Sequence, residues 1–479
     1  MSIARVKPVE QSISDTDEPG RRLRKSLSAL DLTVFGVGVI IGTGIFVLTG
    51  QQAAVNAGPA IVLSFLIAGA VCALAALCYA EFASTVPVAG SAYTFSYATL
   101  GELAAWIIGW DLCLELALGA AVVSRGWSAY LASLFDLPPW LAGDAARPDW
   151  GAVAIVAVLT AVGVVGTKLS GRFTAVLVGI KVAVVLAVIG FGLFFVKAAN
   201  YSPFLPPGEP AERVSGGEAP LLQVLAGVTP QHFGWFGVLA AASIVFFAYI
   251  GFDVVATTAE ETRNPQRDMP RGILGSLAIC VVLYMATAAV ITGMSPYREL
   301  NTGAPLAKAF DDVGQAWAAN LISLGALAGI TTVILVLMLG QSRVLFAMAR
   351  DGLLPPRLAA VHPRFGTPWL VTVLVGAVVA VLAALIPLSE LSELTSIGTL
   401  FAFVLVSIGV VILRRTRPDL KRAFRVPWVP WLPAASVLAC LWLMLNLPVQ
   451  TWVRFAVWML LGLIVYAVYG RRRSRLRRP

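Results

Sequence analysis

Residues 39–50 read VIIGTGIFVLTG, and they lie inside an apolar run long enough to cross a bilayer. Three glycines, Gly42, Gly44 and Gly50, interrupt this run. A glycine destabilises a helix interior by about 1 kcal/mol relative to alanine. A membrane helix that carries Gly-Thr-Gly near its middle is therefore expected to be unwound there for a purpose.

The whole chain has the composition of a polytopic membrane protein. Of its 479 residues, 58% are hydrophobic and only 13% are charged, whereas soluble domains carry about 25% charged residues. The five cysteines lie in apolar segments and the two histidines in predicted loops, without metal-ligand spacing. The chain also has no HExxH, GxSxG or P-loop motif. We therefore expect neither an enzyme nor a cofactor or metal site.

Twelve apolar segments have about the 20 residues that a membrane helix needs. They are expected at 29–55, 60–86, 103–134, 151–168, 172–198, 236–261, 271–293, 318–348, 368–387, 393–414, 431–448 and 452–470. The least certain division separates the fourth and fifth segments, where KLSGR at 168–172 lies between two apolar runs.

The basic residues orient these spans. Of 35 Lys and Arg residues, 27 fall on the side of the N-terminus and six on the other side, and Arg125 and Lys181 lie within spans. Since cytoplasmic loops carry the excess of basic residues, we expect both termini inside a cell membrane. The net charge of +9 follows from this topology and gives no support for a nucleic-acid partner. The tail RRRSRLRRP at 471–479 suits an anionic bilayer surface.

A second interrupted segment reads FFAYIGFDVV at 246–255. It lies five spans after the first, so the two segments cross the membrane in opposite directions. Broken helices at matching positions of two halves indicate an inverted-repeat transporter and its binding site. The predicted division is a cytoplasmic segment 1–28, a first repeat 29–198 of five helices, an extracytoplasmic loop 199–235, a second repeat 236–414, two further helices at 415–470 and the tail 471–479.

Unwound backbone offers a specific chemistry. Main-chain N–H and C=O groups without helical partners are tolerated in a bilayer only where they line a cavity. The N-terminal end of a half-helix suits a carboxylate, and carbonyls at a C-terminal end suit an ammonium. One site with both features suits a free amino acid. The competing interpretation is that glycines such as Gly38 and Gly42 only bring helices close together.

Long motifs support this interpretation. The stretches GVGVIIGTGIFVLTG, VFFAYIGFDVVATTAEETRNPQRDMPRGIL and GQSRVLFAMARDGLLP resemble the cationic amino acid transporter branch of the amino acid–polyamine–organocation superfamily. The resemblance extends from Arg24 to Gly470. It implies an all-α membrane fold of twelve helices, with a five-plus-five inverted repeat, broken helices 1 and 6, and two C-terminal helices.

The resemblance also implies a set of binding residues. Main-chain N–H groups would bind the substrate carboxylate, at Gly42, Thr43 and Gly44. Main-chain carbonyls would bind the α-amine, at Ile40, Phe247 and Ile250. Phe247, or its neighbour Phe246, would cover the substrate. A Cβ added to Gly44 is expected to block the approach of the ligand while leaving membrane insertion intact.

Lys181 lies about 13 Å along its span from Arg172, too deep to reach the membrane surface. Charged groups at this depth are costly and are candidates for a function. Burial disfavours the charged form of an amine, and in relatives an ammonium here replaces a coupling sodium ion, so we expect Lys181 to couple transport to protons. The alternative is a permanently charged lysine that holds carbonyls of spans 1 and 8.

Acidic residues in the spans suggest two further roles. Glu115 lies near the middle of span 3, where its carboxylate would pair with a cationic substrate side chain. Asp111, one turn earlier, is expected near the cytoplasmic vestibule. Asp253 follows the second break, and Glu260 and Glu261 lie two turns later near the inner mouth. Gating pairs with Arg343 or with the loop at Arg263 are one possibility, and a solvated helix end is the other.

The function expected from these features is secondary active transport of L-amino acids, cationic or small and neutral, coupled to protons. Exchange without protons remains an alternative, and so does a channel or a non-transporting receptor. A channel needs a continuous polar stripe or repeated pore loops, which spans 2, 4, 9 and 11 lack. The expected partners are the amino acid, protons and the lipid bilayer, and the sequence identifies no partner subunit.

Overall fold

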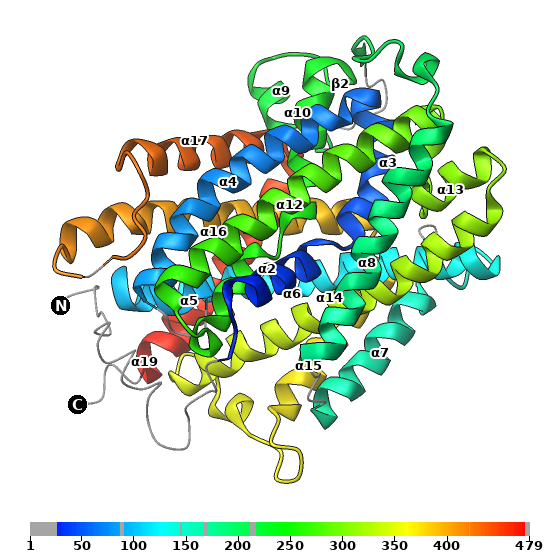
Figure 1. The fold of residues 1–479 in the computed structure, drawn as a ribbon. Coiled ribbons are helices and arrows are strands. Elements are labelled where there is room, and N and C mark those ends of the chain that lie inside the picture. Colours follow the sequence, from blue (N-terminus) through cyan, green and yellow to red (C-terminus); the bar gives the residue numbers. More distant parts are fainter. Residues whose placement is uncertain are drawn as a thin grey trace.

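The computed structural model describes residues 26–86, 91–143, 146–166, 171–210, 217–420 and 422–474. Residues 1–25 of the expected segment 1–28 and residues 475–479 of the expected tail 471–479 lie outside the described residues, as does the link at Lys168. Within them the chain is helical almost throughout (Figure 1).

Helical segments overlap the expected ranges, and three further α-helices, at 91–99, 221–225 and 305–312, lie between them. The longer α-helices are α2 (Ala29–Ile40), α4 (Ile61–Thr85), α5 (Ser91–Thr99), α6 (Glu102–Phe135), α7 (Trp150–Val165), α8 (Gly171–Gly192), α10 (Gly234–Val245), α12 (Pro265–Met294), α13 (Pro305–Asp312), α14 (Ala316–Arg350), α15 (Trp369–Leu385), α16 (Leu388–Thr416), α17 (Trp431–Leu445) and α18 (Val449–Val465). The short α-helices are α3 (Thr49–Gln52), α9 (Leu221–Leu225), α11 (Phe252–Val255) and α19 (Arg471–Arg473). The 3₁₀ and π segments are η1 (Gly44–Leu48), η2 (Ala53–Ala57), η3 (Gly58–Ala60), η4 (Leu193–Phe195), η5 (Ala198–Tyr201), η6 (Phe246–Tyr249), η7 (Ala256–Glu261), η8 (Tyr297–Leu300), η9 (Pro356–Ala359) and η10 (Tyr466–Gly470).

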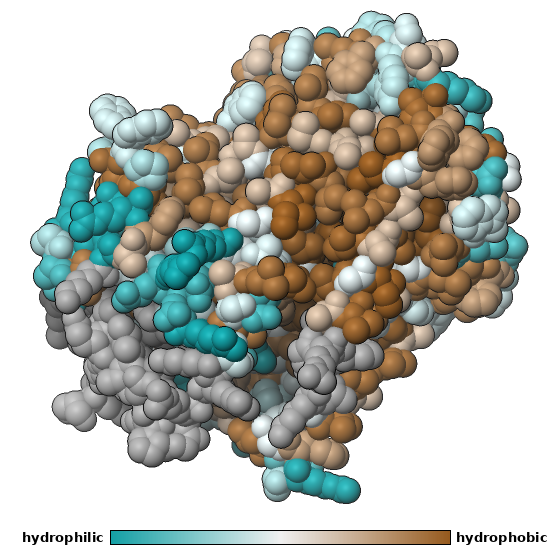
Figure 2. All heavy atoms as spheres, viewed as in Figure 1, coloured by the Kyte–Doolittle hydropathy of each residue, from teal (hydrophilic) through white to brown (hydrophobic). Residues whose placement is uncertain are grey.

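Eight helical stretches among the described residues are long and apolar enough to cross a membrane, and four shorter apolar helices accompany them. The shorter ones are α2, α7, α15 and α17. A broad apolar band crosses the face shown in Figure 2, between a polar region at the lower left and a paler one at the top. Large apolar side chains of α8, such as Val176 and Leu186, lie exposed, as expected of side chains that contact lipid.

The long helices α6 and α14 pack against each other near the centre, and α16 packs against α6. α12 packs against both α2 and α4. α2 begins with a capping box, in which the Ser28 Oγ accepts from the Asp31 N–H and the Asp31 carboxylate accepts from the Ser28 N–H. The start of the first interrupted span is thus fixed at Ser28.

Two polar clusters tie distant segments together on the side of the molecule where α19 lies (Figure 1). The buried carboxylate of Glu81 accepts two hydrogen bonds from the Arg414 guanidinium, at 2.8 and 2.5 Å, and a third from the Val426 N–H at 2.7 Å. Glu102, at the start of α6, accepts hydrogen bonds from the hydroxyls of Tyr466 and Ser474. The ends of α4, α6, α16 and α18 are therefore fixed relative to one another.

On the same side, the chain before α2 is bonded to the chain after η7. The N–H groups of Ser26 and Leu27 donate to the Glu261 carbonyl at 2.8 and 3.0 Å. The Arg263 N–H donates to the Leu27 carbonyl at 2.9 Å. These three main-chain bonds join the start of the first interrupted span to the end of the second.

At the opposite end, around α9 and β2 at the top of Figure 1, the described part of the loop 199–235 has local structure. Strand β1 (Glu209–Pro210) pairs antiparallel with β2 (Gln231–His232), with Glu209 opposite His232. Three main-chain bonds join this loop to the turn between α17 and α18: Leu221 N–H to Leu447 O, Val449 N–H to Ala219 O, and Gln450 N–H to Gly217 O. The loop is thus built into the fold.

Candidate functional site

The first interrupted span unwinds where the sequence predicts. α2 ends at Ile40, and Ile41 is extended, with φ −70° and ψ 100°. The chain resumes at Gly44 as a π-helical turn and continues in a helical form to Ala57. The first N–H groups of a helix have no partner within it. The N–H groups near Gly42–Gly44 are therefore left at the start of the second half-helix of this span.

The second interrupted span breaks at Ile250 and Gly251. α10 tightens into the 3₁₀ turn η6, Ile250 is extended, and Gly251 has φ +128°. This is a conformation that glycine adopts readily. A Cβ at Gly251 would also lie 2.9 Å from Val39 Cγ1, so only glycine fits. The Gly251 N–H donates to the Asp253 carboxylate at 3.1 Å, a bond that spans the break.

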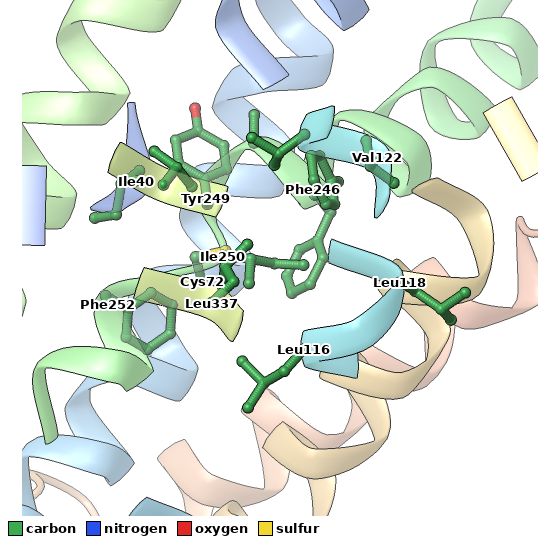
Figure 3. Packing of buried hydrophobic residues seen from close by; sticks show 14 of the residues in the cluster. Ile40, Cys72, Leu116, Leu118, Val122, Phe246, Tyr249, Ile250, Phe252 and Leu337 are labelled. Atoms are coloured by element: carbon green, nitrogen blue, oxygen red, sulfur yellow. The ribbon is translucent and has the colours of Figure 1, made fainter. Parts of the chain in front are cut away.

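The two breaks meet near the centre of the helix bundle. Figure 3 shows Ile40 to the upper left of Ile250, with Phe252 and Leu337 below them. The half-helices approach each other closely at Gly44, where a Cβ would lie 2.3 Å from the Ala248 Cα. Thr43 is held against α6 by a weak 3.4 Å hydrogen bond from its hydroxyl to the Val123 carbonyl.

A small closed cavity lies at this junction. It is about 20 Å³ in volume, room for little more than one water molecule. The lining comes from both breaks and from α6 and α14: Val39, Ile40, Gly42, Thr43, Gly44, Glu115, Leu116, Gly119, Val123, Phe247, Ala248, Ile250, Val333 and Leu337. The described conformation is therefore closed around the junction.

Seven of the eight predicted binding residues line this cavity, and Phe246 does not. Phe246 is fully buried and packs edge-on against Phe403, with ring centroids 5.6 Å apart. Of the two phenylalanines, only Phe247 is placed to cover a substrate. The one-residue difference arises because the 3₁₀ turn at 246–249 directs neighbouring side chains to different sides.

Two of the three predicted carbonyls already accept a hydrogen bond. The Tyr284 hydroxyl donates to the Ile40 carbonyl at 2.7 Å, and the Ile250 N–H donates to the Phe247 carbonyl at 3.1 Å. A carbonyl oxygen has two lone pairs, so each retains capacity for an ammonium. Tyr284 thereby fixes the end of α2 at the cavity.

Glu115 is the carboxylate of this cavity. It is 1% exposed, and its Oε1 has no hydrogen-bond partner among the described residues. Arg125, the alternative partner on the same helix, donates instead to the carbonyls of Ala383 and Ala146. An unpartnered buried oxygen here is available to a donor group of a ligand.

Asp111 differs from its expected position near a vestibule. It is 0% exposed, and neither of its carboxylate oxygens has a partner among the described residues. Asp111 and Glu115 both face Gly398 of α16, whose Cβ would lie 3.2 Å from Asp111 Oδ1 and 3.9 Å from Glu115 Cβ. The spacing of four residues predicts that Asp111 and Glu115 share one face of α6. Their burial follows from the packing of α16 over that face.

Lys181 is fully buried beside the end of α2. Its Nζ donates to the carbonyls of Gly38 at 2.5 Å and Ile41 at 3.3 Å. Gly329 of α14 packs against its stem, since a Cβ there would lie 3.0 Å from the Lys181 Cβ. The ammonium therefore holds carbonyls of the first break, and its contact with α14 is through the aliphatic stem.

The proposed gating residues are placed differently from the pairs expected. Asp253 accepts a hydrogen bond from the Gly251 N–H at the second break. The Glu261 carbonyl binds the segment before α2, and no ion pair to Arg343 occurs among the side chains that the structure describes. The side chain of Glu260 lies outside the described residues.

Several lining residues were not predicted. Leu116, Val333 and Leu337 supply apolar walls, and Gly119 allows α6 to approach. Leu116 adjoins Glu115 in sequence, and Val333 and Leu337 lie one turn apart on α14. This spacing marks one face of a helix, but every buried span shows it, so the pattern alone does not identify a binding wall.

Comparison with known proteins gives a consistent result. The profile of the amino acid permease family matches residues 27–468, nearly the whole chain. The methylthioribose transporter of Bacillus subtilis is 45% identical, and the branched-chain amino acid permease BcaP of the same organism is 44% identical, each over 99% of both chains. The cationic amino acid transporter 1 of Arabidopsis thaliana is 34% identical over 94% of this chain and 83% of its own.

Proposed function

Because this chain belongs to the amino acid permease family, and is a multi-pass membrane transporter rather than an enzyme, we propose that it carries L-amino acids across a membrane by alternating access. The observation that carries this proposal is the cavity at the two helix breaks. It combines the N–H end of one half-helix, carbonyls of two others and a buried carboxylate.

The two ends of an amino acid would occupy different parts of the cavity. The carboxylate would accept hydrogen bonds from the main-chain N–H groups of Gly42, Thr43 and Gly44. The α-ammonium would donate to the carbonyls of Ile40, Phe247 and Ile250. Phe247 would cover the bound molecule. The lining of the cavity supports this pose, and the closed conformation corresponds to a state that must open to load substrate.

The walls support two side-chain classes. Leu116, Val123, Val333 and Leu337 favour a small or branched aliphatic side chain. The unpartnered oxygen of Glu115 favours a cationic one. Both classes appear among the names of relatives, as a branched-chain permease and cationic transporters. A third relative is named as a transporter of methylthioribose, a solute that has neither an α-amine nor a carboxylate.

The decisive experiment is uptake by purified protein in lipid vesicles. Labelled L-alanine, L-leucine, L-lysine and 5-methylthioribose are offered separately, and L-alanine methyl ester and N-acetyl-L-alanine are offered as competitors. We expect uptake of at least one amino acid and no competition by either blocked derivative, because each lacks one of the two charged ends. Uptake of methylthioribose alone would reject the proposal, as would saturable binding of amino acids without transport, which a receptor would show.

We propose further that transport is coupled to protons through Lys181, because its ammonium holds the carbonyls of Gly38 and Ile41 at the first break. Loss of the proton would release these carbonyls and loosen α8 from α2. Such a two-state element couples a proton to opening only if the two states bind the proton unequally. Exchange of amino acids without protons is the alternative, and imposed pH gradients distinguish the two.

The architecture that we propose has twelve spans, with helices 1–5 at 29–198 and helices 6–10 at 236–414 as inverted repeats. Two further helices follow at 415–470, and both termini lie on the cytoplasmic side of a cell membrane. The opposite directions of the two interrupted spans and the bias of basic residues support this layout. Single cysteines at Ser202 and Thr416, tested with an impermeant thiol reagent on intact cells, would react only at Ser202 if the orientation is right.

A further inference from the structure

A second cavity lies beside the loop that carries α9 and β2, at the end of the molecule opposite α19 (Figure 1). We call it the loop cavity. Its volume is about 320 Å³, and it shares no lining residue with the central cavity. One wall comes from Asn56, at the end of the first interrupted span, and from Ala240 and Ile244 of α10. The other walls come from α16, the turn before α18, and residues 218–232.

The charged groups around the loop cavity are mostly acidic. Three carboxylates line it, those of Glu218, Glu390 and Glu393, against one guanidinium, that of Arg454. Arg454 pairs with Glu390 at 2.7 Å. Glu393 accepts a hydrogen bond from the neutral Thr451 hydroxyl at 3.0 Å, and no cation contacts it among the described residues. His232 also lines the cavity and contacts the Asn56 amide at 3.3 Å.

Asn446, which also lines this cavity, carries a buried acceptor without a partner in the described part of the chain. Asn446 is 2% exposed, and its Nδ2 donates to the Trp442 carbonyl at 2.8 Å, which fixes the orientation of the amide. Its Oδ1 then has no hydrogen-bond partner among the described residues. A buried polar atom left without a partner costs free energy, so it marks a place where a donor is missing.

The cavity walls are built rather than accidental. The main-chain bonds from Leu221 to Leu447, from Val449 to Ala219 and from Gln450 to Gly217 hold the loop against the turn before α18. The acidic side chains therefore surround a space of fixed shape. Among the described residues, no three His, Cys, Asp or Glu side chains converge as ligands of a metal ion. The spread of acceptors suits an extended organic cation.

We propose that the loop cavity binds an organic ammonium compound, with Glu393 and the Asn446 Oδ1 as its acceptors. The ammonium group would donate to both, and a second cationic group would reach Glu218. The ammonium could belong to a free amine or to an aminophospholipid headgroup at the bilayer surface. This site is additional to the central one and does not depend on which substrate the protein transports.

The test is calorimetric titration of the full-length protein with putrescine, a diamine that has no carboxylate for the central helix end. The protein is placed in nanodiscs of phosphatidylcholine, which has no primary amine. Glu393→Gln should weaken putrescine binding about tenfold, the scale of one charge-assisted hydrogen bond. Glu299→Gln removes an exposed carboxylate outside the cavity and is the matched control, with binding unchanged.

A variant that is expected to bind putrescine more tightly is also included, because misfolding cannot produce a gain of affinity. Arg454→Gln releases Glu390 from its ion pair, so putrescine should bind more tightly than to the unmodified protein. Glu115→Gln should leave putrescine binding unchanged, since Glu115 belongs to the central cavity. The proposal is overturned if putrescine does not saturate, if Glu393→Gln and Arg454→Gln both bind as the unmodified protein does, or if only Glu115→Gln abolishes binding.

A second arm identifies the source of the ammonium. The titration is repeated in nanodiscs that contain phosphatidylethanolamine. If the headgroup occupies the cavity, the apparent affinity for putrescine falls in these nanodiscs, and Glu393→Gln removes the difference. If a free amine is the ligand, the two lipid compositions give the same affinity. Either result supports the site.

Discussion

Gly44 and Ala248 face each other across the two interrupted spans so closely that a Cβ on the glycine would lie 2.3 Å from the alanine Cα. The side of Gly44 that would carry a side chain therefore faces the neighbouring half-helix and not a ligand. A larger residue at Gly44 is expected to separate the two half-helices. From the sequence we expect a Cβ at Gly44 to block the ligand and leave membrane insertion intact. The structure instead predicts that such a Cβ disturbs the packing of the two half-helices.

Gly42 offers the cleaner test of the backbone site. A Cβ there would meet Val333 at 3.5 Å, which is ordinary van der Waals contact, and Val333 lines the central cavity. Gly42→Ala should therefore fold normally but lower substrate affinity by about tenfold or more, as one extra methyl group does in a tight pocket. Binding is measured by isotope competition on purified protein.

Gly179→Ala is the matched control, because nothing lies within 4 Å of a Cβ at that glycine of α8. It should bind like the unmodified protein. Unchanged affinity in a well-folded Gly42→Ala protein would remove the backbone-site proposal.

Glu115→Gln tests the choice of side chain. The substitution removes the buried negative charge but keeps the size of the residue. Affinity for lysine or arginine should fall more than affinity for alanine, since only a cationic side chain brings a charge to this carboxylate. Competition curves for the three amino acids measure the difference. An equal loss for all three would place Glu115 in a structural role.

Leu337→Ala tests the size limit of the cavity. Leu337 lines a space of about 20 Å³, so its truncation should admit larger side chains. The ratio of leucine uptake to alanine uptake is expected to rise by a factor of about ten, the scale of one to two methylene groups in an apolar pocket. Leu321→Ala on the same helix removes an exposed leucine and should leave the ratio unchanged. A fixed ratio in both variants would exclude Leu337 as a size limit.

Lys181→Ala tests the source of energy. The variant should still exchange labelled for unlabelled substrate across vesicles without a gradient, because Lys181 does not line the central cavity. It should lose the accumulation of substrate driven by an inward proton gradient. Uptake is measured at fixed external pH while the internal pH varies.

Lys181→Arg separates two roles of the same residue. Arginine keeps the positive charge and does not lose its proton at any accessible pH. If Lys181 only tethers carbonyls, the arginine variant should accumulate substrate normally. If Lys181→Ala still concentrates substrate in proportion to the pH gradient, Lys181 is not the coupling residue. The buried carboxyl groups of Asp111, Glu115 and Asp253 then become the candidates.

Glu81→Gln tests the tie between α4 and α16. The Glu81 side chain is 1% exposed, and the substitution leaves Arg414 without its carboxylate, which should cost about 3 kcal/mol. The midpoint of thermal unfolding in detergent should fall clearly. Glu209→Gln is the control, because its ion pair with Arg298 is about half exposed and contributes about 0–1 kcal/mol. Equal midpoints for the two variants would contradict the structural role of Glu81.

The sequence predicts the spans and the breaks well because both depend on local properties. Apolar length decides where helices cross, and glycines with adjacent polar residues decide where they unwind. Gly251 shows this directly, since its φ of +128° is a conformation that disfavours other residues. The positions of Gly42, Thr43 and Ile250 at the cavity follow from the same two breaks.

Other features depend on tertiary packing and escaped prediction. Which of Phe246 and Phe247 lines the cavity depends on a 3₁₀ turn that no residue pattern predicts. The burial of Asp111 depends on α16, which is nearly 300 residues further along the chain. The loop cavity depends on main-chain bonds between a proline-rich loop and the turn before α18, and neither segment has a periodic pattern.

The three main-chain bonds that join residues 26–27 to residues 261–263 have a consequence for the order of events in a transport cycle. If the α2 part of the first interrupted span moved away alone, these bonds would break, at a net cost of about 1 kcal/mol each. If α2 and the η7 end of the second span moved together, all three bonds would survive. Intermediates in which only one of these two segments is displaced are thus disfavoured, and the two segments should move as a single element.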